Sequence, residues 1–160
     1  MLVLRERWVL TLALRDEPAP YSTPLFYALA EPGRVGAHAA PLLISACAPD
    51  THHGRLAGAG PTPASAGLYL ETEDVAALRG VQLRGLWVRE DRCSAGAAAQ
   101  LREVYLERHR AAEPVLASGH HRLYALIVTW AKLTDNRLGF GKHGITRFDA
   151  DWSEVKPSPG

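Results

Sequence analysis

The sequence lacks several features that mark common protein classes. It has only two cysteines, Cys47 and Cys93, and they lie far apart with no Cys-x-x-Cys spacing. This usage fits reduced thiols that serve as packing residues, and it argues against a disulfide framework. The chain also has no Gly-x-Ser-x-Gly elbow, P-loop or dinucleotide-binding glycine fingerprint. The common hydrolases, NTPases and Rossmann enzymes that carry these motifs are therefore not expected.

Excess charge and long apolar runs are missing as well. Lys and Arg total 18 against 17 Asp and Glu, so the net charge is +1 and no long-range field attracts nucleic acid or anionic lipid. No run approaches the ~20 apolar residues of a membrane span. Arg5, Glu6 and Arg7 also place charges where a signal peptide needs its apolar stretch. We expect a cytoplasmic protein that binds neither nucleic acid nor membrane.

The composition that is present suits one globular domain. Hydrophobic residues make up 47% and charged residues 22% of the 160 positions, which is enough apolar content to close a core. We assign residues 1–150 to a single domain. Residues 151–160 contain two prolines near the end and are expected to form a flexible tail.

Short apolar runs separated by Pro and Gly predict a protein built mostly of strands. Strands are expected over residues 8–15, 21–29, 41–47, 64–71, 81–89 and 123–133. A short helix is expected to follow Thr51, and one long amphipathic helix is expected over 94–110 with Ser94 as its cap. This order predicts an all-β, six-stranded antiparallel barrel with helical covers.

The best candidate site in the residue pattern is the stretch from Ser45 to Arg55. Ser45 ends a predicted strand, and Thr51, His52 and His53 stand where the short helix begins. Free N–H groups at a helix start carry partial positive charge, so hydroxyl and basic side chains there can hold a phosphate. The alternative is an ordinary capped surface helix with solvated charges.

Three other features allow an ordinary and a functional interpretation. The adjacent pairs His52-His53 and His120-His121 diverge by about 100° on a helix, so neither pair chelates one ion easily and no metal site is expected. Gln82 needs hydrogen-bond partners if its amide is buried, and otherwise it faces solvent. The stretch Gly139-Phe-Gly-Lys142 is expected to form a turn with an exposed lysine.

Taken together, several segments resemble one known family. They are Trp8-Val-Leu-Thr-Leu-Ala, Tyr21-Ser-Thr-Pro-Leu-Phe-Tyr27, Leu43-Ile-Ser45, Pro49-Asp-Thr-His-His-Gly-Arg55, Gly80-Val-Gln-Leu-Arg-Gly85 and Lys132-Leu-Thr-Asp-Asn-Arg-Leu-Gly-Phe-Gly-Lys142. In this order they are similar to the FMN-binding split-barrel superfamily, which is related to pyridoxamine 5′-phosphate oxidase. The last segment is the most specific match, and it resembles a small bacterial branch of largely uncharacterised proteins.

The resemblance implies a six-stranded split barrel that forms a homodimer, with an FMN in each of two grooves between the subunits. It places Ser45, Thr51, His52 and His53 around the flavin phosphate. It places Ser22, Thr23, Pro24 and Gln82 against the isoalloxazine ring, and it lets Lys142 reach the partner's flavin or a substrate. The implied activity is that of an FMN-dependent oxidoreductase with an unknown substrate.

Two departures from the family pattern keep other functions open. His52 and His53 replace the usual Arg or Lys, so phosphate binding is expected to be weaker or to depend on pH. The C-terminal pattern that grips pyridoxal phosphate is not recognisable in Ile145-Thr-Arg-Phe-Asp149, which argues against true pyridoxamine 5′-phosphate oxidase activity. The alternatives are a non-enzymatic flavin- or haem-binding protein for sensing or storage, and a dimer that has lost its cofactor and serves as an interaction module.

Overall fold

The computed structural model describes residues 2–58 and 60–149, so the expected tail at 151–160 lies outside the described residues. The strands are β1 (Val9–Leu14), β2 (Tyr21–Phe26), β3 (Ala28–Ala30), β4 (Leu42–Cys47), β5 (Thr62–Tyr69), β6 (Arg79–Arg89), β7 (Arg122–Asp135) and β8 (His143–Arg147). The helices are α1 (Leu2–Glu6), α2 (His52–Leu56), α3 (Ala95–Arg108) and α4 (Glu113–Ala117). Four short 3₁₀ turns are η1 (Val75–Ala77), η2 (Glu90–Arg92), η3 (Arg110–Ala112) and η4 (Asn136–Leu138).

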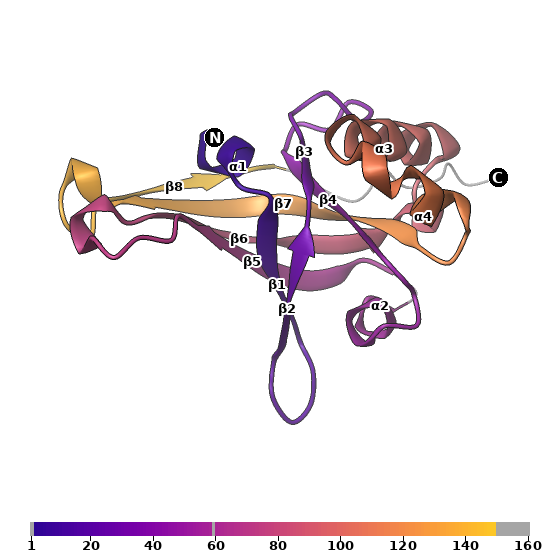
Figure 1. Ribbon diagram of the computed structural model, residues 1–160, viewed down its shortest axis with the longest axis horizontal. Helices are drawn as coiled ribbons and strands as arrows, with labels where there is room; N and C mark the ends of the chain where they lie inside the picture. The colour runs from indigo at the N-terminus through magenta and orange to yellow at the C-terminus, as the bar shows by residue number, and fades with distance from the viewer. Residues whose placement is uncertain (1, 59, 150–160) are drawn as a thin grey trace.

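All the strands form one antiparallel sheet that curls into a split barrel (Figure 1). The strand order is β2-β1-β5-β6-β7-β4-β3, and β8 pairs with β7 outside this path. The first and last strands of the order, β2 and β3, are joined in the chain by Tyr27 alone, which brings the two ends of the sheet together. The predicted antiparallel barrel with helical covers is therefore confirmed.

The prediction of six strands was wrong in two places. The expected strand at 21–29 divides at Tyr27, because residues before it pair with β1 and residues after it pair with β4. Beyond the predicted turn at 139–142, β8 adds an edge strand against the second half of β7. Short strands of this kind depend on the neighbour that they pair with, which local apolar pattern does not reveal.

Two apolar clusters lie on opposite sides of the sheet. One fills the barrel interior and includes Leu12, Trp87 and Tyr124. The other lies between the outside of the barrel and α3, and includes Ile44 and Leu101. Both cysteines are free and buried, and burial raises the pKa of each thiol to about 12, as expected for packing residues.

The helices cover both sides of the sheet, since Val3 and Leu4 of α1 and Leu56 of α2 join the interior cluster and α3 packs on the outside. The N-cap hydroxyl of Thr51 accepts a hydrogen bond from the Gly54 N–H, and Ser94 caps α3 in the same way, so both expected caps are confirmed. Within the described residues, no helix is long and apolar enough to cross a membrane. In Figure 1, the loops that join β5 to β6 and β7 to β8 project side by side at the left end of the molecule, and α2 lies below the sheet, right of its centre.

Candidate functional site

A groove runs along β5 on the outside of the barrel. Four adjoining cavities form it, with volumes of about 500, 460, 350 and 290 Å³. Neighbouring cavities share lining residues: Arg15 and Pro63 join the first two, Ser65 and Arg84 the next two, and Gln82 the last two. The two larger cavities are each within the size range of small-molecule sites.

The sheet register explains which side chains face the groove. Residues directly opposite each other on paired strands point to the same face. One row across six strands is Ser22, Ala13, Ser65, Arg84, Trp130 and Arg147; the next is Pro24, Thr11, Gly67, Gln82, Lys132 and Ile145; a third, on four strands, is Tyr69, Gly80, Thr134 and His143. We call the surface made by these three rows the outer face.

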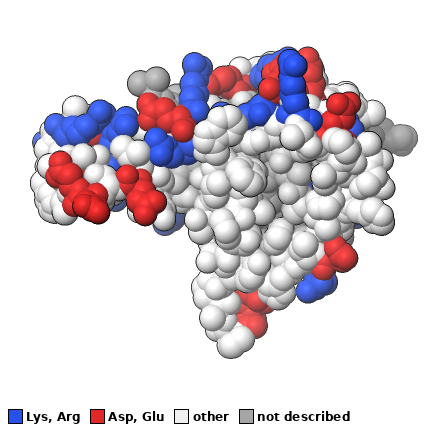
Figure 2. Space-filling view, in the orientation of Figure 1, with Lys and Arg blue, Asp and Glu red and all other residues white. Residues whose placement is uncertain are grey.

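The outer face has an uncharged half and a basic half. The strands β1, β2 and β5 contain no charged residue, and Figure 2 shows the uncharged surface over β1 and β2. The side chains in this half are small as well as uncharged, since Ala13, Ser65 and Gly67 occupy the middle of the half. The charged residues of the three rows come from β6, β7 and β8, and all of them are Arg or Lys.

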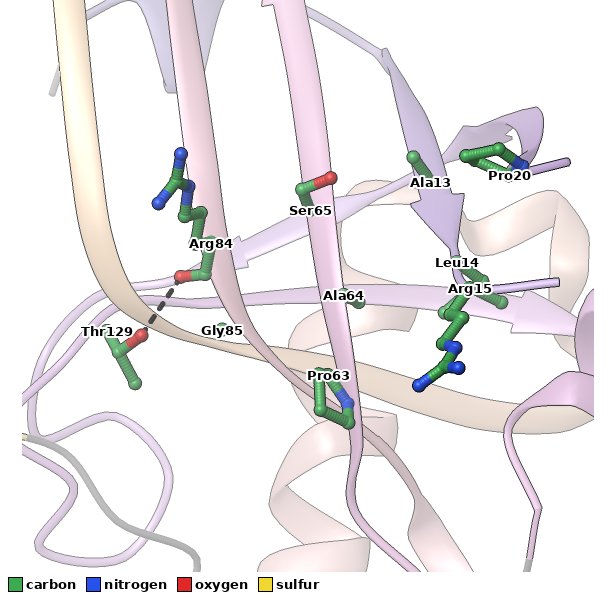
Figure 3. A pocket seen from close by; sticks show the side chains of 10 residues that line it. All are labelled: Ala13, Leu14, Arg15, Pro20, Pro63, Ala64, Ser65, Arg84, Gly85 and Thr129. Carbon is green, nitrogen blue, oxygen red and sulfur yellow. Dashed lines mark hydrogen bonds between the residues drawn. The ribbon is translucent and has the colours of Figure 1, made fainter.

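The cavity of about 460 Å³ lies where these two halves meet (Figure 3). Arg84 and Arg15 stand on opposite sides of it, with Ser65 between them. Arg15 is paired with Glu17 at 3.5 Å. The Arg84 guanidinium lies over the Trp130 ring, 4.9 Å from its centre. This contact holds the arginine stem in place and leaves its N–H groups available.

Gln82 is the predicted residue that the structure places in the groove. It belongs to β6, which pairs with β5 and β7 on either side, so it is not on an edge strand. Its side chain is exposed and lines two of the cavities. Of the two sequence interpretations, the solvent-facing one is confirmed, because the amide is exposed although its strand is central in the sheet. It is accessible to a ligand in the groove.

The β2 residues divide between the two faces of the sheet. Ser22 and Pro24 are exposed and lie opposite Ala13 and Thr11, so they extend the outer face. Thr23 lies opposite the buried Leu12 and points the other way. A ligand on the outer face can therefore meet two of the three predicted β2 residues directly.

At the α2 end of the groove, most donors already have partners within the chain. The Thr51 hydroxyl donates to the Ala48 carbonyl and contacts His53 Nε2 at 3.2 Å. His52 Nε2 lies 2.7 Å from Asp16 Oδ2, and Asp16 lines the cavity of about 500 Å³. The hydrogen bond from His52 is the main cause of the lowered pKa of Asp16, and the hydrogen bond from the Glu17 N–H lowers this pKa further.

The two remaining residues of the predicted phosphate site are buried. Ser45 is fully buried on β4, and its Oγ has no hydrogen-bond partner among the described residues. His53 is 8% exposed, and its Nδ1 also has no partner there. Burial lowers the pKa of His53, and the neighbouring His52 lowers it further, so this imidazole is neutral near pH 7.

Lys142 lies far from α2 within one chain. It is exposed in the loop between η4 and β8, and this loop projects at the left end of the molecule in Figure 1, away from α2. Its loop is held by Asn136, whose side chain donates to the Val75 carbonyl and accepts from the Gly141 N–H. Within one chain, Lys142 is therefore not placed beside the residues at α2.

Sequence reasoning did not identify four residues of the outer face: Ser65, Arg84, Lys132 and Arg147. A local signal existed for Arg84, because the alternation Val81-Gln82-Leu83-Arg84 puts it on the same face as Gln82. For the others the face depends on which strands pair and in what register. Only the tertiary structure supplies that information.

Comparisons with known proteins give the fold. No family model and no curated protein sequence matches the chain. Among solved structures, a haem-binding protein from Mycobacterium smegmatis is similar at 23% identity and a TM-score of 0.69, over 91% of this chain and 55% of that one. The chain thus spans about half the length of that protein.

Two more neighbours share the same architecture. An FAD-binding protein from Mesorhizobium loti matches at 16% identity and a TM-score of 0.56, over 81% of this chain and 85% of that one. A protein of the pyridoxinephosphate oxidase family from Clostridium acetobutylicum matches at 10% identity and a TM-score of 0.61, over 92% and 91%. The chain therefore has the split-barrel fold of the pyridoxamine 5′-phosphate oxidase-like proteins.

Proposed function

We propose that the protein is an FMN-binding flavoprotein whose flavin ring lies on the uncharged half of the outer face, between two copies of the chain. The observation that carries this proposal is the floor formed by Ala13, Ser65 and Gly67 beside the accessible amide of Gln82. Small side chains let a flat ring approach the sheet closely, and a Cβ on Gly67 would meet nothing within 4 Å.

The residues on and around this floor can hold such a ring in different ways. The Gln82 amide can donate to and accept from the polar edge of the flavin pyrimidine ring. Ser22 and Pro24 extend the surface along β2, and the Ser65 hydroxyl offers one more hydrogen bond. When bound, the flavin supplies hydride or electron transfer, while the protein positions it and limits its contact with water. This supports an oxidoreductase in which no side chain need be the catalyst.

For the flavin phosphate we keep Ser45, Thr51, His52 and His53 as the proposed contacts. The unpartnered Ser45 Oγ and His53 Nδ1 favour a polar ligand at this end, since a buried polar atom without a partner is costly. An anion there would compete with Asp16 for His52. Phosphate binding at α2 is thus expected to be weak.

The site also suggests a homodimer. The chain exposes Val9, Phe26, Tyr69 and Ile145, and the Val9–Phe26 pair lies on β1 and β2 next to the Thr11–Pro24 pair of the second row. A second copy packed on this surface would bury these side chains and enclose the groove. It would also supply Lys142 to the partner's flavin. Size-exclusion chromatography with light scattering tests the dimer, and a stable monomer would contradict it.

The deciding experiment is the visible spectrum of the protein purified without added cofactor, followed by titration with FMN. A flavin spectrum, or quenching of FMN fluorescence with one FMN per chain, is expected. A colourless protein that takes up no FMN would contradict the proposal. Reduction of the bound flavin by a nicotinamide nucleotide or another donor then separates an oxidoreductase from a storage protein.

A haem-binding role is the second candidate, and the similarity to the mycobacterial haem-binding protein favours it. Haem is also planar, and its propionates are anionic, so the same floor and the basic half of the outer face suit it. A Soret band in the purified protein, or tight haem uptake without flavin uptake, would establish this alternative.

A further inference from the structure

The basic half of the outer face is the strongest unassigned feature of the molecule. The three rows contain Arg84, Lys132 and Arg147 and have no Asp or Glu at any position. Arg84 and Arg147 both lie directly opposite Trp130, one on each side, and Lys132 is two residues further along β7 on the same face. We call these three residues the basic triad. Its charge is concentrated although the chain as a whole carries only +1.

The triad has no acidic partner in the part of the chain that the structure describes. No carboxylate there lies within 4.0 Å of the charged nitrogens of Arg84, Lys132 or Arg147. Many other arginines are paired, for example Arg34 with two glutamates and Arg137 with Asp135. Three neighbouring cations without a counter-charge repel each other, and an anionic ligand would relieve that repulsion.

A β-bulge fixes the position of Arg84. The register between β6 and β7 shifts between Arg84 and Gly85, which leaves Thr129 as the extra residue on β7. The Thr129 hydroxyl donates to the Arg84 carbonyl at 3.3 Å, as Figure 3 shows, and its own carbonyl accepts from the Phe148 N–H. Gly85 is required here, because a Cβ would lie 1.9 Å from the Ile127 carbonyl oxygen. Bulges commonly redirect a side chain next to a ligand site.

We infer that the basic triad is a binding site for an oxyanion, a phosphate or carboxylate group of a small molecule, separate from the α2 end of the groove. The Arg84 guanidinium, steadied by Trp130 and open to the groove, provides a planar pair of donors for two oxygens. Lys132 and Arg147 add charge from the neighbouring strands. This inference deepens the proposed function, because it names the class of ligand that meets the ring surface.

Inorganic pyrophosphate is the probe that tests the site without any flavin. Its apparent dissociation constant is measured from the shift in thermal unfolding midpoint at low ionic strength, where exposed charges are least screened. Arg84→Gln is expected to weaken binding about tenfold or more, the scale of losing a charge-assisted hydrogen bond. Arg84→Lys keeps the charge but loses the paired donors, so an intermediate loss is expected.

Arg110→Gln is the matched control. Arg110 is exposed in η3 and has no ion pair with another described residue, so this variant removes one positive charge away from the triad. Its pyrophosphate affinity should equal that of the wild type. Circular dichroism checks that Arg84→Gln keeps the fold, which is expected because the side chain is exposed.

Two further arms identify the source of the oxyanion. FMN is compared with riboflavin, which has the same ring but no phosphate, and the pyrophosphate titration is repeated with FMN at saturation. If Arg84→Gln removes the preference for FMN and FMN displaces pyrophosphate, the triad binds the cofactor's own phosphate. If pyrophosphate still binds beside FMN, the triad binds a separate anionic substrate.

The inference is overturned if Arg84→Gln and wild type bind pyrophosphate equally, or if pyrophosphate has no effect on either, as would follow from a partner subunit's carboxylate covering the triad. If no flavin binds, the proposed function fails while the pyrophosphate titration still decides the anion site.

Discussion

The α2 end of the groove and the basic half of the outer face both gather basic side chains, yet their surroundings differ. At α2, His52 faces the Asp16 carboxylate at 2.7 Å, and His53 is buried with a lowered pKa. On the outer face, Arg84 is exposed, lies over Trp130 and has no carboxylate partner among the described residues. The first region already satisfies its charge within the chain, whereas the second does not.

This difference shows that the number of basic residues in a segment does not reveal whether their charges are already paired. What matters is whether each charge is already paired and whether it is hydrated or buried. The sequence drew attention to α2, where hydroxyls and imidazoles are neighbours in the chain. The basic triad comes from three different strands, and its positive charges, unlike His52, have no carboxylate partner among the described residues.

The largest expected effect is on stability, from a substitution at the β-bulge beside Arg84. Gly85→Ala would force a Cβ against the Ile127 backbone, so we expect a loss of more than about 2 kcal/mol in the free energy of unfolding. Gly67→Ala on the same face meets open space and should change stability by less than about 1 kcal/mol. Denaturant unfolding of both variants measures this contrast, and equal losses would mean that the bulge is not as tight as described.

The next largest effect is expected on FMN affinity, when two of the proposed phosphate contacts at α2 are removed. The double variant Thr51→Ala with His52→Ala is expected to weaken FMN binding by about 1–3 kcal/mol, the scale of losing hydrogen bonds to a charged group. Fluorescence titration with FMN measures it. Unchanged affinity would move the phosphate away from α2 and leave the triad as its remaining candidate.

Gln82→Leu tests the proposed contact with the flavin ring separately from the two candidate phosphate sites. We expect a loss of about 1 kcal/mol in flavin affinity, because one or two neutral hydrogen bonds to the ring disappear. FMN and riboflavin should be affected equally, since Gln82 is proposed to contact the ring alone. Because the side chain is exposed, stability should hardly change. A loss specific to FMN would instead place Gln82 near the phosphate.

The smallest effect concerns pH and the buried imidazole. The pKa of His53 is lowered below 6.5 in the folded protein, so the unfolded chain takes up this proton first as pH falls. The free energy of unfolding should therefore decrease on acidification through about pH 6.5, and level off below the folded pKa. His53→Gln should flatten this part of the stability curve, as measured by urea unfolding at several pH values. An unchanged slope would show that another group titrates.

Local pattern was sufficient for much of the fold. The alternation of β1, the cap at Thr51 and the spacing of α3 appear in the chain as contiguous signals, and the structure confirms each. The division of the 21–29 strand at Tyr27 and the edge strand β8 were not predictable in this way, because both depend on a partner strand distant in sequence. Of the site, Gln82 was found, whereas Arg84 two residues away was not.

The sequence by itself determined the strands, the caps and the absence of any strong overall charge, since these follow from residues that are near neighbours in the chain. The tertiary structure alone decided which charges are free. It placed Asp16 against His52, some thirty-six residues apart, and it aligned Arg84, Lys132 and Arg147 across three strands. Electrostatic attraction and burial act between atoms that are close in space, so the availability of a charged group is fixed only when the sheet has its register.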